Sequence, residues 1–244
     1  MRNFKVVIEY EGTDYCGFQS QPNVPTVQGE LERVLSQIVH GRVIVYGSGR
    51  TDAGVHAAGQ VISFRTEGTI PSQKLCVAMN SMLPKSISAV EACEVEKSFH
   101  ARYSAKSRLY RYEIVNSEVR SALRARYAWH VRCPLNAEEM QKAAECLVGV
   151  HDFSAFACAD KDCKSTIRRV HSLDVRREGD RVIVEARANA FLRSMVRVIV
   201  GTLVEVGLGA RSWSDMLGIL DSKDRTQAGK TAPPQGLCLV EVEY

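Results

Sequence analysis

Apolar and polar positions along the first third of the chain form patterns that separate strands from helices. Residues 4–10 alternate with a period of two, and residues 43–46 and 61–64 are short β-branched runs bounded by glycines, so all three segments are predicted strands. Apolar residues recur at i, i+4, i+7, i+8 and i+11 from Val27, which predicts a helix with one buried face. Thr26 is suited to cap the N-terminus of that helix.

A second helix and a further strand complete the first half. Ser72 is suited to cap the N-terminus of the helix, which ends before Pro84 because proline cannot continue a helix, and residues 87–95 form the strand. The resulting order is strand–helix–strand–strand–helix–strand, which is the split order of a ferredoxin-like unit.

The second half repeats this order. Its predicted elements are a strand at 127–131, a helix capped by Asn136, a loop at 151–156, a hairpin of 166–176 and 181–188, a long apolar helix at 190–206, a short helix capped by Ser212 and a last strand at 237–243. Arg193 and Arg197 are expected on one face of the long helix, four residues apart. Two copies of one topology predict a duplicated fold, in which a cleft between the halves is the natural place for a ligand.

Composition narrows the class of protein. The 244 residues are 45% hydrophobic and 25% charged with a formal net charge of +4, which suits one large domain or two smaller ones and is compatible with nucleic-acid binding without being specific for it. No apolar run approaches the ~18 residues of a membrane-spanning helix, and the N-terminus runs directly into a strand without a signal-peptide core. The eight cysteines are scattered with no Cys-x-x-Cys pair, so we expect no metal site and a cytoplasmic protein with reduced thiols.

A glycine-rich loop at residues 47–56 lies between two of the predicted strands. Its side chains capable of polar chemistry are Arg50, Thr51, Asp52 and His56. Glycines allow backbone conformations that a side chain would forbid, so such a loop can hold a few side chains rigidly against a ligand. Asp52 is the only carboxylate between Glu32 and Glu67.

Several kinds of site do not match this loop. It lacks the third glycine of a dinucleotide fingerprint and the Gly-Lys-Ser/Thr of a P-loop. It also lacks the second carboxylate of a glycosidase or aspartic-protease site, and its one Asp and one His have no metal-ligand spacing. Two interpretations stay open: a tight turn in which Asp52 caps backbone N–H groups, or a single nucleophilic carboxylate kept ionised by the neighbouring Arg50.

Basic and aromatic residues are interleaved between positions 97 and 112. They are Lys97, Phe99, Arg102, Tyr103, Lys106, Arg108, Tyr110, Arg111 and Tyr112. Cationic side chains contact phosphates and aromatic rings stack on unpaired bases, so the run is suited to RNA. The alternative is a solvated basic strand whose tyrosines pack inward.

Several motifs together resemble one known family. The active-site loop of the tRNA pseudouridine synthase A family closely resembles the segment Gly47-Ser48-Gly49-Arg50-Thr51-Asp52-Ala53-Gly54-Val55-His56-Ala57-Ala58-Gly59-Gln60-Val61. Further segments that resemble family motifs are 11–19, 21–23, 26–29, 108–112, 151–156, 189–197 and 231–233. The resemblance therefore covers essentially the whole chain.

The resemblance implies a fold and a function. The fold is α+β, with two ferredoxin-like βαββαβ halves, residues 1–104 and 105–244, joined across a pseudo-two-fold axis into a central, mostly antiparallel sheet flanked by helices, with the active-site cleft between the halves. The implied reaction is the isomerisation of uridine to pseudouridine at positions 38, 39 and 40 in the anticodon stem-loop of tRNA. It implies a cytoplasmic homodimer that uses neither a cofactor nor a metal.

The resemblance also implies roles for individual residues. Asp52 matches the catalytic aspartate, with Arg50 or Arg197 as the arginine that pairs with it, and Tyr110 matches the tyrosine that lines the uridine pocket. Family members commonly have histidines where this chain has Leu192, Arg193 and Ser194, so the role of Arg193 stays open. A further set of arginines is either tRNA-contacting or plain surface charge: Arg120, Arg124 and Arg126.

Two other classes of function stay open from the residues alone. An RNA-binding module without chemistry needs the same basic and aromatic surface, but no ionised aspartate in a glycine loop. A cofactor-dependent enzyme is disfavoured because the sequence has no cofactor motif.

Overall fold

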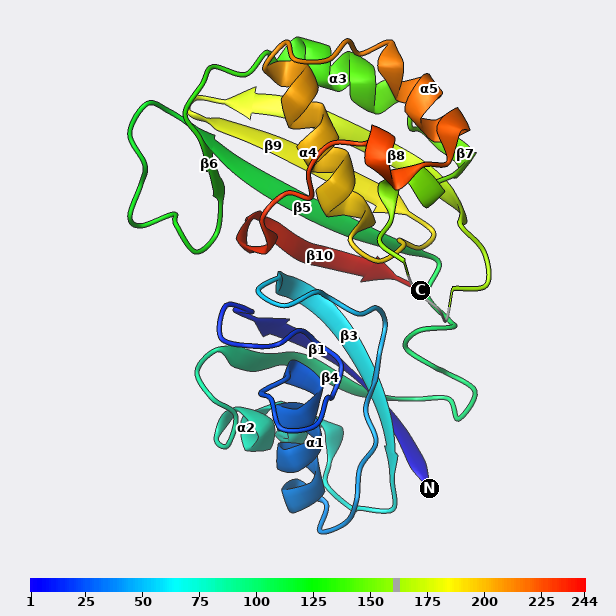
Figure 1. Cartoon of the computed structure of the whole chain (residues 1–244). Helices are drawn as coiled ribbons and strands as arrows, with labels where there is room; N and C mark the ends of the chain where they lie inside the picture. Colours follow the sequence, from blue (N-terminus) through cyan, green and yellow to red (C-terminus); the bar gives the residue numbers. More distant parts are fainter. Residues whose placement is uncertain (160–162) are drawn as a thin grey trace. The chain divides into compact units, whose positions relative to one another are not determined.

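The computed structural model describes residues 1–159 and 163–244, and the chain divides into two compact units. The first unit is Met1–Lys106 together with Leu239–Tyr244, and the second is Ser107–Cys238. Each unit combines a sheet of mostly antiparallel strands with helices (Figure 1), so the prediction of a mixed α+β fold is confirmed. Within the described ranges, no helix has the length and apolar character that crossing a bilayer requires.

The first unit is built on a sheet in the order β4-β1-β3-β10. Its elements are β1 (Arg2–Tyr10), α1 (Val27–Ile38), β2 (Tyr46–Gly47), β3 (His56–Thr66), α2 (Ser72–Asn80), β4 (Ile87–Val95) and the end of β10 (Leu237–Glu243). The central strand β1 pairs antiparallel with both β3 and β4. Phe4 and Phe64 are opposite each other in this register, and their buried rings stack with centroids 5.4 Å apart.

Helix α1 begins where the apolar periodicity predicts. Thr26 has an extended backbone, and its hydroxyl accepts a hydrogen bond from the Gly29 amide at 3.2 Å, which satisfies one of the free N–H groups of the first turn. The apolar face of the helix, which includes Val27, Leu31 and Leu35, is buried. This prediction is therefore confirmed at the level of the capping contact. The cap predicted for the second helix is wrong, because α2 begins at Ser72 itself, Pro71 stands at the cap position and no side-chain cap hydrogen bond forms.

The predicted strand at 43–46 is wrong for most of its length, because only Tyr46 belongs to β2. The Val43 amide donates to the Ser36 hydroxyl, and the Val45 amide donates to the Glu32 carboxylate, both at 3.0 Å. Side chains of α1 thus accept the hydrogen bonds that these amides would otherwise donate to a neighbouring strand.

The second unit has a sheet in the order β5-β9-β8-β7, with β6 parallel to β5. Its strands are β5 (Ser107–Asn116), β6 (Trp129–Val131), β7 (Gly149–Asp152), β8 (Ile167–Glu178) and β9 (Arg181–Ala188). Its helices are α3 (Ala137–Glu145), α4 (Met195–Gly207) and α5 (Asp215–Ser222), with short 3₁₀ turns at η1 (Ser154–Phe156), η2 (Arg225–Gln227) and η3 (Pro234–Gly236). Asn136 caps α3 as predicted, since its side chain accepts hydrogen bonds from the amides of Glu138 and Glu139. The β8–β9 hairpin is also confirmed.

Three predictions in this unit are wrong. Ser212 does not cap the short helix, because α5 begins at Asp215, Ser214 stands at the cap position and no side-chain cap hydrogen bond forms. The long helix begins at Met195 instead of residue 190, because the Asn189 side chain accepts from the Ala190 amide and Ser194 has a left-handed backbone (φ 58°). Arg193 consequently precedes the helix and does not share its face with Arg197. His151 and Asp152, predicted in a loop, belong to β7, where His151 pairs with Arg168 of β8.

Candidate active-site loop

The loop at residues 47–56 is held on both sides of Asp52. The Thr51 side chain is buried, and its hydroxyl lies 2.8 Å from the Tyr10 hydroxyl at the end of β1. The Thr51 carbonyl accepts a hydrogen bond from the Phe18 amide at 3.1 Å, and the Val55 amide donates to the Asp52 carbonyl at 3.2 Å. Asp52 itself is half-buried, on a backbone whose neighbours are fixed.

The start of the loop is fixed to β3. The Ser48 amide donates to the Val61 carbonyl at 2.8 Å, and the Ser48 hydroxyl donates to the buried Gln60 side chain at 2.6 Å. The other end of the Gln60 amide group donates to the Gly49 carbonyl at 2.9 Å. One buried amide side chain therefore joins two successive loop residues to the strand that follows the loop.

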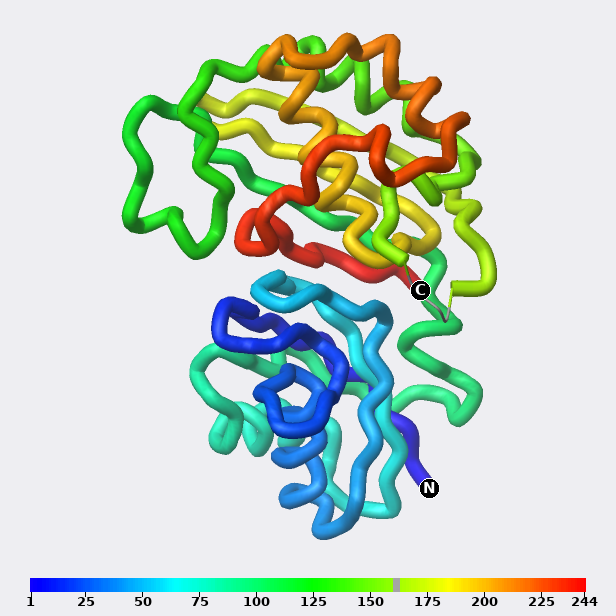
Figure 2. The backbone as a smooth tube through the Cα atoms, viewed as in Figure 1, coloured from blue at the N-terminus to red at the C-terminus, as the bar shows by residue number. Residues whose placement is uncertain are grey.

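A second loop, residues 11–19, follows β1 in the chain (blue in Figure 2) and binds the first loop through hydrogen bonds. The Gly12 amide donates to Nδ1 of His56 at 3.0 Å, so this ring nitrogen is the acceptor. A Cβ on Gly12 would lie 1.9 Å from the Val55 carbonyl oxygen, and Gly17 combines φ +95° with a Cβ position 2.9 Å from the Thr51 carbonyl oxygen. Both glycines are needed for the close approach of two backbones.

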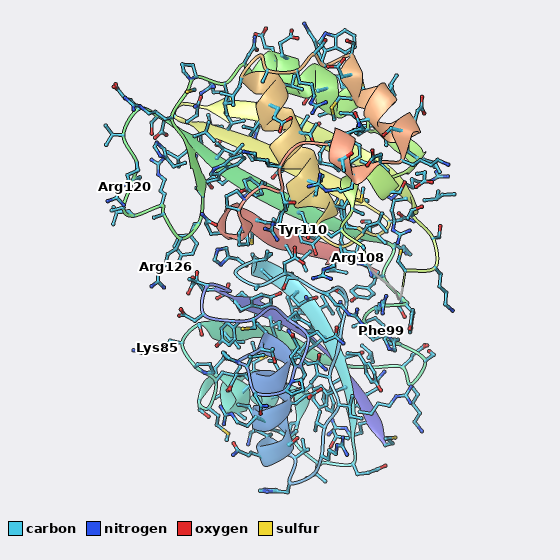
Figure 3. All side chains as sticks on the ribbon, viewed as in Figure 1. Lys85, Phe99, Arg108, Tyr110, Arg120 and Arg126 are labelled. Carbon is cyan, nitrogen blue, oxygen red and sulfur yellow. The ribbon has the colours of Figure 1, made fainter. Side chains whose placement is uncertain are left out.

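Tyr110 and Arg108 come from the same strand, β5, in the second unit (Figure 3). Tyr110 is only 7% exposed, and its ring meets Phe191 edge-to-face with centroids 5.1 Å apart. The guanidinium of Arg108, also buried, donates to the Asn189 carbonyl at 2.6 Å. The β5 strand thus binds the segment that precedes α4 through both side chains.

Arg197, in the first turn of α4, is bound to Ala232 twice. Its Nε donates to the Ala232 carbonyl at 2.8 Å, and the Ala232 amide donates to the Arg197 carbonyl at 3.0 Å. The Tyr112 hydroxyl donates to the adjacent Pro233 carbonyl at 2.7 Å. Burial raises the pKa of the Tyr112 phenol well above its usual range, an effect that the positive charge of Arg197 opposes, so the phenol keeps the proton that it donates.

The segment at 228–233 is held closely against α4. The Gly229 amide donates to the buried Thr202 hydroxyl at 2.9 Å. A Cβ on Gly201 would lie 1.7 Å from the Lys230 carbonyl oxygen. The helix and this segment can therefore lie this close only because residue 201 has no side chain. The orientation of Arg197 therefore depends on packing along a whole turn of the helix.

The predicted site residues fall in two groups. Asp52 and Arg50 lie in the first unit, whereas Tyr110 and Arg197 lie in the second. The Arg50 side chain is exposed, and no ion pair of Arg50 occurs among the described residues. Sequence reasoning missed Tyr10 and Gln60 as supports of the loop, since the Tyr10–Thr51 contact joins residues 41 positions apart.

The basic and aromatic run at 97–112 divides in the structure. Tyr110 and Tyr112 are buried, as the strand interpretation predicts, while Tyr103 is exposed. Arg120 and Arg126 lie on the long loop between β5 and β6 (Figure 3). Arg124 of the same loop donates two hydrogen bonds to Asp180, at 3.0 and 2.9 Å, so its guanidinium has a structural partner.

Comparison with known proteins identifies relatives over the full length. Residues 6–104 and 143–244 match the family model described as "tRNA pseudouridine synthase". The protein named "tRNA pseudouridine synthase A" in Thermoanaerobacter sp. (strain X514) is 49% identical over 244 residues, which is 100% of both chains. The protein of the same name in Brevibacillus brevis is also 49% identical over 244 residues and 100% of both chains.

A more distant relative and one solved structure complete the comparison. The "tRNA pseudouridine synthase A" of Geobacter sp. (strain M21) is 44% identical over 245 residues, covering 100% of this chain and 99% of that one. A solved structure described as "Crystal Structure of a Cbf5-Nop10-Gar1 Complex" covers 97% of this chain and 48% of that chain with a TM-score of 0.36 and 11% identity, a similarity too low to support an argument. The matched family model and the full-length relatives show that the chain belongs to the tRNA pseudouridine synthase family.

Proposed function

We propose that this protein converts uridine to pseudouridine at positions 38, 39 and 40 in the anticodon stem-loop of tRNA, with Asp52 as its single catalytic carboxylate. Membership of a family of isomerases makes the chain an enzyme, and the names of its relatives support tRNA as the substrate. The observation that supports Asp52 most directly is the rigid loop around it, in which Thr51, Ser48 and His56 are each fixed by buried hydrogen bonds.

The reaction needs no external reactant. Uridine and pseudouridine are isomers: the C1′–N1 bond breaks, a C1′–C5 bond forms, and a proton leaves C5 while N1 gains one. Because no electrons are gained or lost overall, the balance requires no redox cofactor. The reacting atoms of a stacked base are shielded, so the nucleotide must leave the stem to reach a protein carboxylate.

The proposed roles follow from the chemistry of each side chain. Asp52 acts as the nucleophile on the sugar or the base, or assists elimination to a glycal. Arg50 or Arg197 pairs with the aspartate, and Arg50 can also fill the gap that the extruded base leaves. Tyr110 stacks on the uracil and exchanges a proton through its hydroxyl.

The proposal includes the arrangement of the protein. Two ferredoxin-like halves, residues 1–104 and 105–244, would be related by a pseudo-two-fold axis with the substrate cleft between them. The order of elements from β1 to β4, strand–helix–strand–strand–helix–strand, supports this for the first half. We further propose a cytoplasmic homodimer, as the family resemblance implies.

An activity assay tests the proposed function. Purified protein is incubated with an unmodified tRNA transcript that has uridines at positions 38–40, and pseudouridine is mapped at nucleotide resolution. Pseudouridine confined to these positions is the expected result. A protein that binds the transcript without modifying it would instead be an RNA-binding module.

Removing the hydroxyl of Tyr110 should separate stacking from proton transfer. The Tyr110→Phe variant keeps the ring, which packs edge-to-face on Phe191, so tRNA affinity should stay close to that of the parent. Turnover should fall about 10²- to 10⁴-fold, since general acid–base assistance contributes on that scale. Single-turnover rates at saturating enzyme measure the effect, and Tyr127→Phe, an exposed tyrosine of the same unit, is the control. Full turnover in Tyr110→Phe would reduce Tyr110 to a stacking surface.

Chelation should leave the reaction intact. No group of three His, Cys, Asp or Glu side chains within residues 1–159 and 163–244 is placed to hold a metal ion, and the bond changes require none. Pseudouridine formation in excess EDTA, with enough monovalent salt to keep the tRNA folded, should therefore equal the untreated rate. A loss of activity that zinc restores while the tRNA stays folded would contradict the prediction.

A further inference from the structure

A short ladder of aromatic rings lies on the first unit, beside the strand that leads into the candidate active-site loop. Tyr46 of β2 lies 4.8 Å from the His100 ring, and His100 lies 4.5 Å from the Tyr103 ring, measured between centroids. The guanidinium carbon of Arg102 lies 5.7 Å from the centroid of Tyr103. We call these four residues, Tyr46, His100, Arg102 and Tyr103, the aromatic ladder.

The two outer rings of the aromatic ladder are exposed to solvent, and His100 between them is half-buried. Tyr103 is 78% exposed and Tyr46 is 44% exposed, whereas Tyr110 and Tyr112 are buried. Single exposed apolar side chains are ordinary, but three rings in succession with a cation against the outermost one form a continuous surface. Such a surface has the geometry on which unpaired bases stack.

The backbone below the ladder is fixed before any ligand binds. Ser63 of β3 pairs with Tyr46 in the β2–β3 register, and the Ser63 hydroxyl accepts from the Ala101 amide at 3.0 Å. The Ala101 carbonyl accepts from the Tyr244 hydroxyl at 2.7 Å, and the Tyr244 ring packs 4.9 Å from Phe99. The backbone that carries the rings is therefore ordered in advance, which lowers the ordering entropy lost when a ligand stacks on them.

The charges around the ladder favour an anion. Burial lowers the pKa of His100 below its usual range, and the nearby charges that act in the same direction are those of Arg102 and Arg65. The exposed Arg65 donates to the Lys97 carbonyl at 2.8 Å. This contact places a second arginine beside the segment that carries Arg102. A neutral imidazole between two tyrosines stacks as a ring, and the arginines supply the charge that pairs with phosphate.

We propose that the aromatic ladder is an RNA-contact site, which binds one or two unpaired nucleotides of the substrate outside the uridine pocket, with Tyr103 stacking on a base and Arg102 contacting a phosphate. This inference rests on the proposed function, because it assigns part of the same RNA substrate to this surface. RNA matches it better than a second protein copy does, since the surface combines flat rings with cations.

The test measures binding separately from turnover. Each variant is made together with Asp52→Asn and titrated with an unmodified tRNA transcript at several salt concentrations. Tyr103→Ala should weaken binding about 5- to 100-fold with an unchanged salt slope, because a stacked ring releases no counterions. Arg102→Gln should lower the slope of log affinity against log salt by about one.

Two controls and one alternative occupant make the outcome decisive. Tyr103→Phe keeps the ring and should bind within about twofold of the parent, and Trp213→Ala removes a 41% exposed aromatic of the second unit and should do the same. The proposal is overturned if Tyr103→Ala binds as the parent does, or if Trp213→Ala weakens binding equally. It is also overturned if Tyr103→Ala lowers the oligomeric mass in light scattering, since the ladder would then bind a second copy of the chain.

The result stays distinct from a failure of the proposed function. If the protein binds tRNA, loses affinity on Tyr103→Ala and forms no pseudouridine without the Asp52 change, the enzymatic assignment fails and the RNA-contact site stands. If pseudouridine forms and Tyr103→Ala binds normally, the reverse holds.

Discussion

Replacing Asp52 by asparagine should abolish pseudouridine formation and leave the protein folded. The amide has nearly the shape of the carboxylate but is a poor nucleophile, so turnover should fall by at least about 10³-fold. The loop should survive, because Tyr10 and Phe18 bind Thr51 and Gln60 binds Gly49, and the substitution leaves these contacts in place. Single-turnover assays give the rate, and thermal unfolding should give a Tm close to that of the parent.

The same variant should retain tRNA binding. Basic residues elsewhere supply the phosphate contacts, so the salt slope should not change, and removal of one negative charge can even raise the affinity slightly. Asp221→Asn, the same substitution at an exposed carboxylate of α5, is the control and should keep the parental rate. Near-parental turnover in Asp52→Asn would show that this aspartate is only a turn residue.

A methyl group at Gly201 should disturb the enzyme through Arg197. The new Cβ would stand 1.7 Å from the Lys230 carbonyl oxygen, and since the obstacle is backbone, the helix or the 228–233 segment must move. Overpacking of this kind destabilises by about 1–3 kcal/mol, which exceeds the ~1 kcal/mol that alanine gains over glycine as a helix former. Gly201→Ala should therefore lower Tm by about 2–8 °C.

The activity of Gly201→Ala should fall more than its stability suggests. The displaced segment holds Arg197 through Ala232 and binds the Tyr112 hydroxyl through Pro233, and a shift of about 1 Å in a positioned group can reduce a rate about 100-fold. Gly218→Ala is the matched control, because this glycine of α5 has no atom within 4 Å of its Cβ position. It should keep full activity and unfold at the same or a slightly higher temperature. A Gly201→Ala protein with parental Tm and rate would exclude the dependence of Arg197 on this packing.

Local sequence patterns predicted the elements whose stability is local. The Thr26 cap and the apolar face of α1 lie within one helix, and β4 and β10 have the bounds predicted for the strands at 87–95 and 237–243. The predicted strand at 43–46 failed because side chains of α1, Ser36 and Glu32, take its backbone donors. The sequence pattern of residues 43–46 contains no information about which side chains of the preceding helix accept hydrogen bonds from their amides.

The candidate site shows the same limit. The resemblance led to the loop around Asp52, but two of the contacts that fix it join residues 41 and 44 positions apart, Tyr10 to Thr51 and Gly12 to His56. The late start of α4 has a comparable cause, because Arg108 of β5 and Arg169 of β8 both bind Asn189 and hold the preceding segment out of the helix. Long-range polar contacts of this kind leave no repeat in the sequence, so the roles of Tyr110 and Arg197 stay predictions.

The last strand has a consequence for the order in which the protein can fold. Leu239–Tyr244 belong to the first unit, where the Glu243 carbonyl accepts from the Lys106 amide and the backbone at Val240 lies against Gly59 of β3. A ribosome adds about 5–20 residues per second, so the whole second unit is synthesised before the strand that completes the first one. During those roughly ten seconds the nascent chain exposes the β3 edge of an unfinished sheet, and unpaired edges are where chains associate wrongly. The second unit consists of contiguous residues and can finish folding before the first unit has its last strand. The first unit thus begins to be synthesised first but is completed last.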